Sequence, residues 1–242
     1  MLGFAAGEVV ASIATVVAAE VAGKSNQLSA ISHQSVPPEW YVISSLVGLW
    51  VGFFGAPWLA SRVRGTRSLV NDLGLRFRVI DLVGIVIGVG GQLLITALYS
   101  PFIHDLKHFN APTQRLTGGS HGGGLVIIGI FTVIGAPFFE ELFFRGLILR
   151  GLLRFLAPFR LGRSTARTVA VVASVVLDGL LFALAHAEWE QLAGLALFGM
   201  VLAVVSYRTG RQGMNMVAHA SFNLVAILAV ATSNGVLLAG PH

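Results

Sequence analysis

Apolar runs long enough to cross a bilayer constrain the fold of this chain more than any other feature. A spanning helix needs about 20 mainly apolar residues, and seven stretches reach or approach that length. They are Leu2–Ala22, Tyr41–Ala60, Leu82–Tyr99, Gly124–Leu149, Thr168–Ala187, Leu192–Tyr207 and Met214–Ala231. The runs are too long for strands of a membrane barrel, and they lack its strict alternation. We therefore predict an all-α, polytopic transmembrane helix bundle with seven, or eight, spanning helices.

Composition agrees with a membrane protein. Apolar residues make up 55% of the chain and charged residues only 11%, against about 25% charged residues in soluble domains. Cysteine is absent, which excludes disulfides and thiolate metal sites. The net charge of +5 comes from arginines between the apolar runs, without the basic tail typical of nucleic-acid binding. No repeat or linker stands out, so we predict one integral-membrane domain over residues 1–242.

The first run is the least regular of the seven, because Glu8 and Glu20 interrupt it. It lacks the basic start of a signal peptide, so we predict that it is a helix. Two glycine pairs, Gly48 with Gly52 and Gly84 with Gly88, have the spacing that lets helices approach closely.

The basic residues predict the orientation of the chain. Twelve of the 16 lysines and arginines fall in three alternate connections. They are Arg62, Arg64, Arg67, Arg76 and Arg78; Arg150, Arg154, Arg160, Arg163 and Arg167; and Arg208 and Arg211. Cytoplasmic loops carry such an excess. We expect an integral protein of a plasma or inner membrane, with the bilayer as its partner, a cytoplasmic amino terminus and an outer carboxyl terminus.

The stretch APFFEELFFRGL places Glu140, Glu141 and Arg145 inside an apolar run. A charge at the bilayer centre costs about 2.5 to 3.5 kcal/mol even on the lenient insertion scale, so these groups should be paired inside the bundle. Glu141 and Arg145 are four residues apart with the acid first, the favourable order for an intrahelical ion pair. Glu140 lies about 100° around the helix, so its partners should come from other helices.

Two later runs offer such partners. His186 follows Phe182 by four residues, and Asn223 follows His219 by four. Together with the acidic pair these groups can take a proton from water and stabilise an oxyanion at a carbonyl under attack. Asp178 lies on the same stripe as His186, where a structural role and a supporting role are both open.

The ordered motifs EExxxR (Glu140, Glu141, Arg145), FxxxH (Phe182, His186) and HxxxN (His219, Asn223) resemble the CAAX protease and bacteriocin-processing (CPBP) family. The segments DLGLRFR and YRTGRQGMNMVAHASFN resemble its members too. The resemblance implies a motif-bearing core over residues 124–231 and an intramembrane endopeptidase whose site opens to the cytoplasm. Its substrate would be a membrane-associated peptide or protein. The substrate's identity, prenylation included, and the oligomeric state lie beyond the sequence.

The resemblance also implies roles for the motif residues. Glu140 with His186 would activate a water, His219 and Asn223 would stabilise the oxyanion, and Glu141 with Arg145 would organise the site. Phe182 would be a packing residue.

A cofactor and a second function remain open at this point. The favoured mechanism requires no cofactor. If zinc is bound, its ligands would be Glu140, His186 and His219. Two His and a Glu suit zinc, but the sequence contains no HExxH motif. The alternative function is a non-catalytic scaffold or bacteriocin-immunity type of protein with the same fold. A transporter would be expected to show an inverted repeat, and the sequence shows none.

The simple topology places the two histidines at different depths. His186 lies near the outer end of its helix, whereas His219 lies six residues into the last helix from the cytoplasmic side. If both belong to one site, we expect the chain around residues 187–191 to dip into the bundle, which is tolerated when protein surrounds the backbone.

Overall fold

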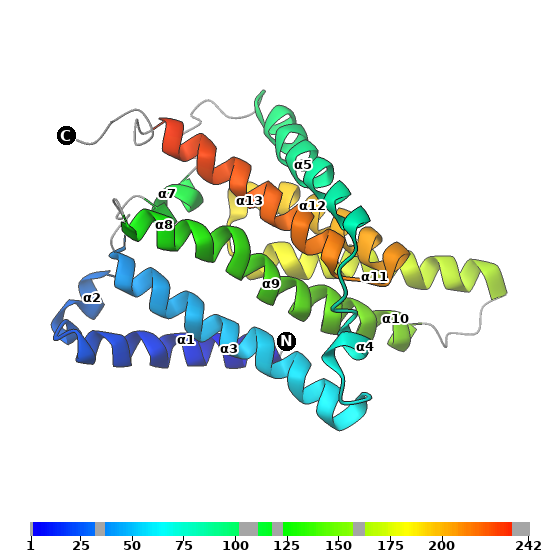
Figure 1. Ribbon diagram of the computed structural model, residues 1–242, viewed down its shortest axis with the longest axis horizontal. Coiled ribbons are helices and arrows are strands. Elements are labelled where there is room, and N and C mark those ends of the chain that lie inside the picture. Colours follow the sequence, from blue (N-terminus) through cyan, green and yellow to red (C-terminus); the bar gives the residue numbers. More distant parts are fainter. Residues whose placement is uncertain (1, 32–36, 102–110, 118–122, 157–162, 234–242) are drawn as a thin grey trace. The chain divides into compact units, whose positions relative to one another are not determined.

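A computed structural model describes residues 2–31, 37–101, 111–117, 123–156 and 163–233, and the regular structure of these residues is helical (Figure 1). The α-helices are α1 (Leu2–Val21), α2 (Leu28–Ile31), α3 (Glu39–Arg64), α4 (Leu69–Leu73), α5 (Gly84–Tyr99), α7 (Ala111–Thr117), α8 (Gly123–Ile130), α9 (Ala136–Glu141), α10 (Arg150–Leu156), α11 (Arg163–Ala185), α12 (Leu192–Thr209) and α13 (Gly213–Ser233). Short 3-10 helices are η1 (Ser25–Gln27), η2 (Val79–Val83) and η5 (Trp189–Gln191), and η3 (Phe131–Gly135) and η4 (Leu142–Leu149) are π-helical. The all-α prediction is confirmed.

Six helical segments of the described chain are long and apolar enough to cross a membrane. They are Glu39–Arg64, Val79–Tyr99, Gly123–Leu156, Thr165–Ala185, Trp189–Thr209 and Gly213–Thr232. Each overlaps one predicted run. The first predicted run forms α1 but is not among the six, so its place as a seventh span stays a prediction.

The chain divides into two compact units, each built from separate segments. Unit 1 comprises Met1–Gly52, Ile87–Pro137 and Ala220–His242. Unit 2 comprises Phe53–Val86 and Phe138–His219. Because both units are discontinuous, neither is a domain in the sequence sense, and the single integral-membrane domain stays a prediction.

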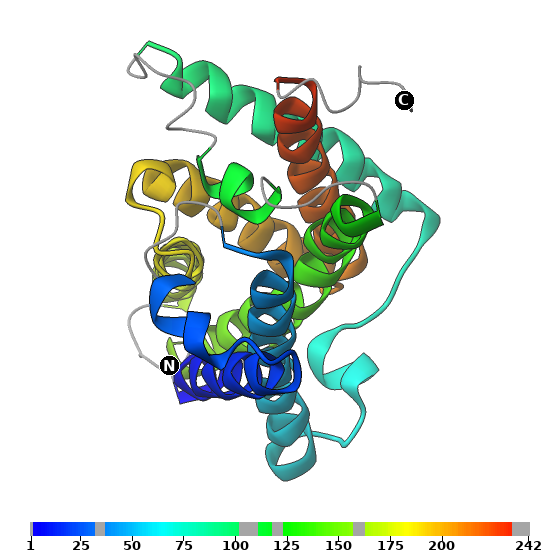
Figure 2. The same cartoon turned by 90° about the vertical axis from the view of Figure 1, so that its left-hand side faces the viewer.

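In unit 1, α1 packs along the first half of α3, as Figures 1 and 2 both show. A Cβ atom added at Gly48 would lie 2.3 Å from the Cα atom of Ala11, so the two backbones touch there. One turn away, the hydroxyls of Thr15 and Ser45 share a hydrogen bond of 3.1 Å. Small residues and hydroxyl groups therefore hold this pair, which is how helices associate in lipid. The close approach predicted for Gly48 is confirmed.

In unit 2, α11 and α12 run side by side in opposite directions (Figure 1). They touch where a Cβ atom at Gly199 would lie 3.0 Å from the Cα atom of Gly179. Leu149 of η4, Val175 and Ala203 form a buried cluster against this pair. The close approach brings the backbone of α12, including the Gly199 carbonyl, within reach of a side chain from η4.

The start of α13 is held by the segment around Gly74, also in unit 2. The backbone N–H groups of Gln212 and Gly213 donate to the carbonyls of Gly74 and Arg76, at 2.9 and 3.2 Å. Arg150 donates to the Gly210 carbonyl at 2.9 Å. Gly74 has a left-handed φ of 71°, and a Cβ there would collide with that guanidinium. The two loop segments that resemble the CPBP family thus bind each other.

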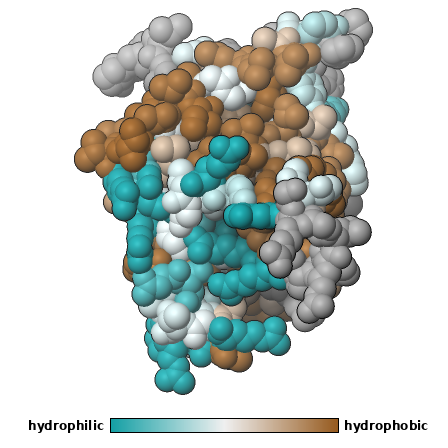
Figure 3. Space-filling model, turned by 90° about the vertical axis from the view of Figure 1, so that its right-hand side faces the viewer, coloured by the Kyte–Doolittle hydropathy of each residue, from teal (hydrophilic) through white to brown (hydrophobic). Residues whose placement is uncertain are grey.

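Hydrophilic side chains gather on the lower part of the face that Figure 3 presents, the right-hand side of Figure 1, and hydrophobic side chains cover its upper part. The arginines of the connection after α3, in unit 2, are exposed: Arg62, Arg64, Arg67, Arg76 and Arg78. The first residue of α5, Gly84, closely approaches the start of α13, because a Cβ atom at Gly84 would lie 2.5 Å from the Met214 carbonyl oxygen. The close approach predicted for Gly84 is therefore confirmed.

Candidate active site

The predicted ion pair of Glu141 and Arg145 is present and fully buried in unit 2. The Arg145 Nη1 atom lies 3.0 Å from Glu141 Oε1, and both side chains are 0% exposed. The helix widens into the π-helical η4 directly after Glu141. Such widened turns are rare and occur often at functional sites.

Three further groups surround the Arg145 guanidinium. Nη2 donates to the Gly199 carbonyl at 3.0 Å, and Nε lies 3.4 Å from Asp178 Oδ2. Its Cζ atom stands 4.4 Å from the centroid of the Phe182 ring. An arginine so enclosed has its charge balanced by two carboxylates, a carbonyl and an aromatic face.

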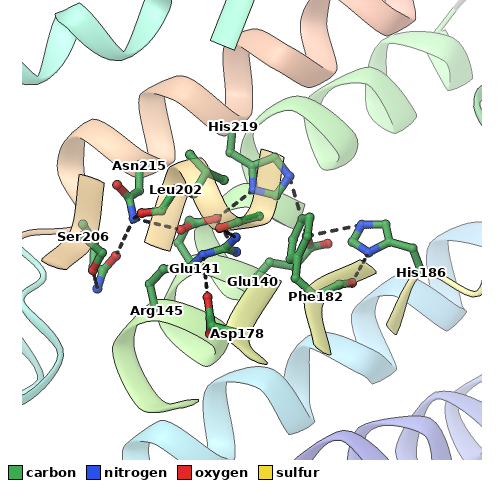
Figure 4. Close-up of polar contacts among 12 residues, drawn as sticks. Glu140, Glu141, Arg145, Asp178, Phe182, His186, Leu202, Ser206, Asn215 and His219 are labelled. Atoms are coloured by element: carbon green, nitrogen blue, oxygen red, sulfur yellow. Dashed lines mark hydrogen bonds and ion pairs between the residues drawn. The ribbon is translucent and has the colours of Figure 1, made fainter. Parts of the chain in front are cut away.

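The Glu141 carboxylate accepts hydrogen bonds from three side chains. His219 Nδ1 lies 3.0 Å from Oε1, the oxygen that also binds Arg145. Asn215 Nδ2 donates to Oε2 at 3.3 Å. With both oxygens engaged, Glu141 is fixed in orientation (Figure 4).

Glu140 faces two histidines instead, as its place on the helix predicts. Its Oε2 atom lies 3.8 Å from His186 Nε2 and 3.7 Å from His219 Nε2. Among the described residues this buried oxygen has no hydrogen-bond partner. Buried polar atoms without partners are rare in native proteins, and one explanation is a water or ion that the site holds.

The other nitrogen of each imidazole is already in use. His186 Nδ1 lies 2.8 Å from the Phe182 carbonyl oxygen, and His219 Nδ1 faces the Glu141 carboxylate. A carbonyl and a carboxylate only accept hydrogen bonds, so each Nδ1 atom carries a proton. Both rings consequently present Nε2 to Glu140.

The two histidines that the simple topology places at different depths meet within unit 2. The dip into the bundle expected around residues 187–191 is not found, because Ala187, Trp189 and Glu190 are exposed. The ring of His186 folds back along α11 and lies 4.6 Å from the Phe182 ring, centroid to centroid. Side chains at a helix end point back toward its start, and Ala187 turns the chain away with a positive φ of 53°. His186 and His219 thereby reach the same carboxylate oxygen from different helices.

Asn223 is the one predicted site residue outside unit 2. Its Nδ2 atom donates to the Thr132 carbonyl at 2.8 Å, within unit 1. Thr132 lies in the π-helical η3, where widened turns free carbonyl groups for outside partners. The role of Asn223 toward an oxyanion stays a prediction.

Two residues, Asn215 and Phe182, contact the site residues in ways that the sequence analysis did not predict. Asn215 was not singled out, although it precedes His219 by four residues on one face of α13 and binds Glu141. Phe182 was predicted to be packing alone, yet its ring touches Arg145, His186 and His219. The spacing of Asn215 from His219 was the available signal for the first. For Phe182, the four-residue spacing indicated the contact with His186, and nothing in the sequence indicated those with Arg145 and His219.

The residues named for zinc are Glu140, His186 and His219, and Glu140 Oε2 lies 3.8 and 3.7 Å from the two Nε2 atoms. Zinc binding by this set stays a prediction. The described part of the chain contains no group of three or more His, Cys, Asp or Glu placed to hold a metal ion.

One known family model spans all three sequence motifs, EExxxR, FxxxH and HxxxN. Residues 122–225 match the family model described as type II CAAX prenyl endopeptidase Rce1-like. These residues form an Rce1-like domain. All three motifs, from Glu140 to Asn223, lie inside it, so the resemblance to the CPBP family is confirmed. At family level the Rce1-like domain is that of a CAAX-type membrane protease, a hydrolase of peptide bonds. No curated protein and no solved structure matches the chain.

Proposed function

We propose that this chain is an intramembrane endopeptidase that hydrolyses a peptide bond of a membrane-associated protein or peptide. The observation that carries the proposal is the arrangement around Glu140 Oε2, a buried oxygen that faces two imidazole Nε2 atoms and has no hydrogen-bond partner in the described part of the chain. A water between these atoms donates one hydrogen bond to the carboxylate and one to an imidazole. Water is the nucleophile that peptide hydrolysis needs.

Glu140 is the base in this mechanism, and His186 orients the water. Glu140 takes a proton from the water, the oxygen attacks the carbonyl carbon of the substrate, and a tetrahedral oxyanion forms. Glu140 then passes the proton to the leaving amine as the C–N bond breaks. The products are a carboxylic acid and an amine. A positioned acid or base of this kind contributes about 10²- to 10⁴-fold to a rate.

His219 is the proposed group that stabilises the oxyanion, through its Nε2 atom. Its Nδ1 atom is held by the Glu141 carboxylate, as a buried carboxylate orients the histidine of a hydrolase triad, and Nε2 is thereby directed toward Glu140. Asn223 is the proposed second oxyanion donor.

The mechanism uses no metal, because the nucleophile is made by protein groups alone. We further propose that the site opens to the cytoplasmic side, where the arginine-rich connections are expected. The natural chain lacks cysteine, so single cysteines introduced at Thr66 and at Glu190 would report the orientation through labelling in intact cells. Labelling of Glu190→Cys alone by an impermeant reagent is the expected result.

The deciding experiment is cleavage of candidate membrane substrates by the purified full chain in detergent. Wild type is compared with Glu140→Ala and His219→Ala, and with Glu190→Ala as a control carboxylate on the surface. We expect a loss of about 10²-fold or more in kcat for the first two variants and none for the control. Equal processing by all four proteins rejects the catalytic assignment. Retention of activity after treatment with a chelator is expected, and its loss would contradict the metal-free mechanism.

A further inference from the structure

Asn215 is a buried carboxamide next to the proposed catalytic groups, and no role has been assigned to it. It is 0% exposed and lies one helical turn before His219 on α13. Its Nδ2 atom donates to the Leu202 carbonyl at 3.0 Å and to Glu141 Oε2 at 3.3 Å (Figure 4). A third acceptor, Gln212 Oε1, lies at the longer distance of 3.5 Å.

Through its Nδ2 atom, Asn215 of α13 binds both the backbone of α12 and the Glu141 carboxylate. An NH₂ group has two hydrogens, and the two shorter contacts use both. The Leu202 carbonyl fixes the amide, and the amide fixes Oε2 of the carboxylate. The opposite oxygen, Oε1, then faces His219 Nδ1 at 3.0 Å. Successive turns of α13 thus hold the two oxygens of one carboxylate.

We infer that Asn215 is a positioning residue for His219, acting through Glu141. Without the amide, Oε2 would be a buried carboxylate oxygen lacking a donor, which is costly. The carboxylate could then rotate about its last bond and take Oε1 away from the imidazole. The proton on Nδ1 would lose its fixed acceptor, and Nε2 would no longer be held as the nitrogen that faces Glu140.

The inference rests on the proposed function for its kinetic consequence, but not for its spectroscopic one. The test uses the full chain in detergent micelles, labelled with ¹⁵N-histidine, with His219→Ala identifying the signals of that ring. In wild type we expect His219 to be protonated at Nδ1 throughout. In Asn215→Leu, which keeps the shape and removes the donors, we expect a mixture of protonation at the two nitrogens. The expected loss in kcat is about tenfold or more, with KM little changed.

Two further variants separate positioning from packing. Ser174→Ala removes a different buried polar group of unit 2, which binds the Ala170 carbonyl of its own helix; its thermal stability falls slightly, and the His219 signals stay as in wild type. Asn215→Ser provides the smaller replacement should the leucine variant fail to fold. Its hydroxyl is too short to reach Glu141, so it should shift the His219 signals in the same direction.

The outcomes are distinct. Unchanged His219 signals in the folded Asn215 variants overturn the inference, whatever their activity. If wild type cleaves no substrate, the proposed function fails, while the imidazole signals still decide the role of Asn215. Altered signals together with a fall in kcat support both.

Discussion

The charged cluster of unit 2 and the α1–α3 contact of unit 1 both bury polar groups among apolar helices, and they do so in opposite ways. Thr15 donates to the Ala11 carbonyl of its own helix at 2.8 Å, and Ser44 donates to the Tyr41 carbonyl at 3.0 Å. Each hydroxyl is satisfied locally, and the hydrogen bond between the helices is additional.

The charged cluster, defined here as Glu140, Glu141, Arg145, Asp178 and His219, depends on groups far apart in the chain. Glu141 and Arg145 bind partners from other helices, whereas Glu140 Oε2 and both oxygens of Asp178 have no hydrogen-bond partner among the described residues. Local satisfaction thus makes a polar group a structural contact, whereas a fixed frame around unsatisfied polar atoms makes a site for chemistry.

The largest effect on stability should follow from removing the cation of the cluster. Arg145→Met leaves the carboxylates of Glu141 and Asp178 buried without their partner, and breaking a buried pair costs about 3 to 5 kcal/mol. Thermal unfolding in detergent measures the loss.

The matched control for this prediction is the triple variant Arg145→Met, Glu141→Gln, Asp178→Asn. Replacing all charges together is often close to neutral, so this variant should regain folding but not activity. If the single variant were as stable as wild type, Arg145 would not be the cation that stabilises the buried carboxylates of the charged cluster.

A smaller effect is expected where α1 and α3 touch. In Gly48→Ala the new methyl group meets the backbone of Ala11, and overpacking of this kind costs about 1 to 3 kcal/mol. Gly55→Ala on the same helix has nothing within 4 Å of the new atom, and it should gain about 0.5 to 1 kcal/mol. Changes of the same sign in the two unfolding temperatures would contradict the packing of this pair.

The hydroxyl contact itself should contribute little. Thr15→Val keeps the shape and removes the bonds to Ala11 and Ser45, and such contacts in membrane proteins average about 0.6 kcal/mol. Ser12→Ala removes an exposed hydroxyl from the same helix and should change nothing. Cleavage should be unaffected by both variants, and a loss of activity in Thr15→Val would break the distinction between the two regions.

The smallest effect belongs to Asp72, a carboxylate outside the spanning segments. Hydrogen bonds from Ser61 and from the Thr66 backbone lower its pKa from 3.8 to about 2. A lowered pKa in the folded state stabilises the protein above pH 3.8, and that contribution is lost as the pH falls from there to about 2. Between pH 3.8 and about 2, the free energy of unfolding should therefore fall less in Asp72→Asn than in wild type. Equal losses would mean that Asp72 does not contribute.

Much of this architecture was predictable because the bilayer permits few solutions. Backbone groups in lipid must be satisfied internally, so apolar length alone predicted the helices that the structure contains. Intrahelical spacing predicted the Glu141–Arg145 pair, since residues four apart on a helix are neighbours whatever surrounds them. The π-helical turns beside Glu141 could not be read from the sequence, because they arise from packing against other helices.

The sequence by itself determined the all-α membrane class, the family motifs and the local ion pair, because each follows from composition or from spacing along one helix. Only the tertiary structure decided that Glu140 meets His186 and His219, that Asn215 binds Glu141, and that Phe182 contacts three polar groups. Except for the contact of Phe182 with His186, those contacts join residues about 40 to 80 positions apart. Their geometry depends on where helices end and cross, and no periodicity along a single helix encodes that.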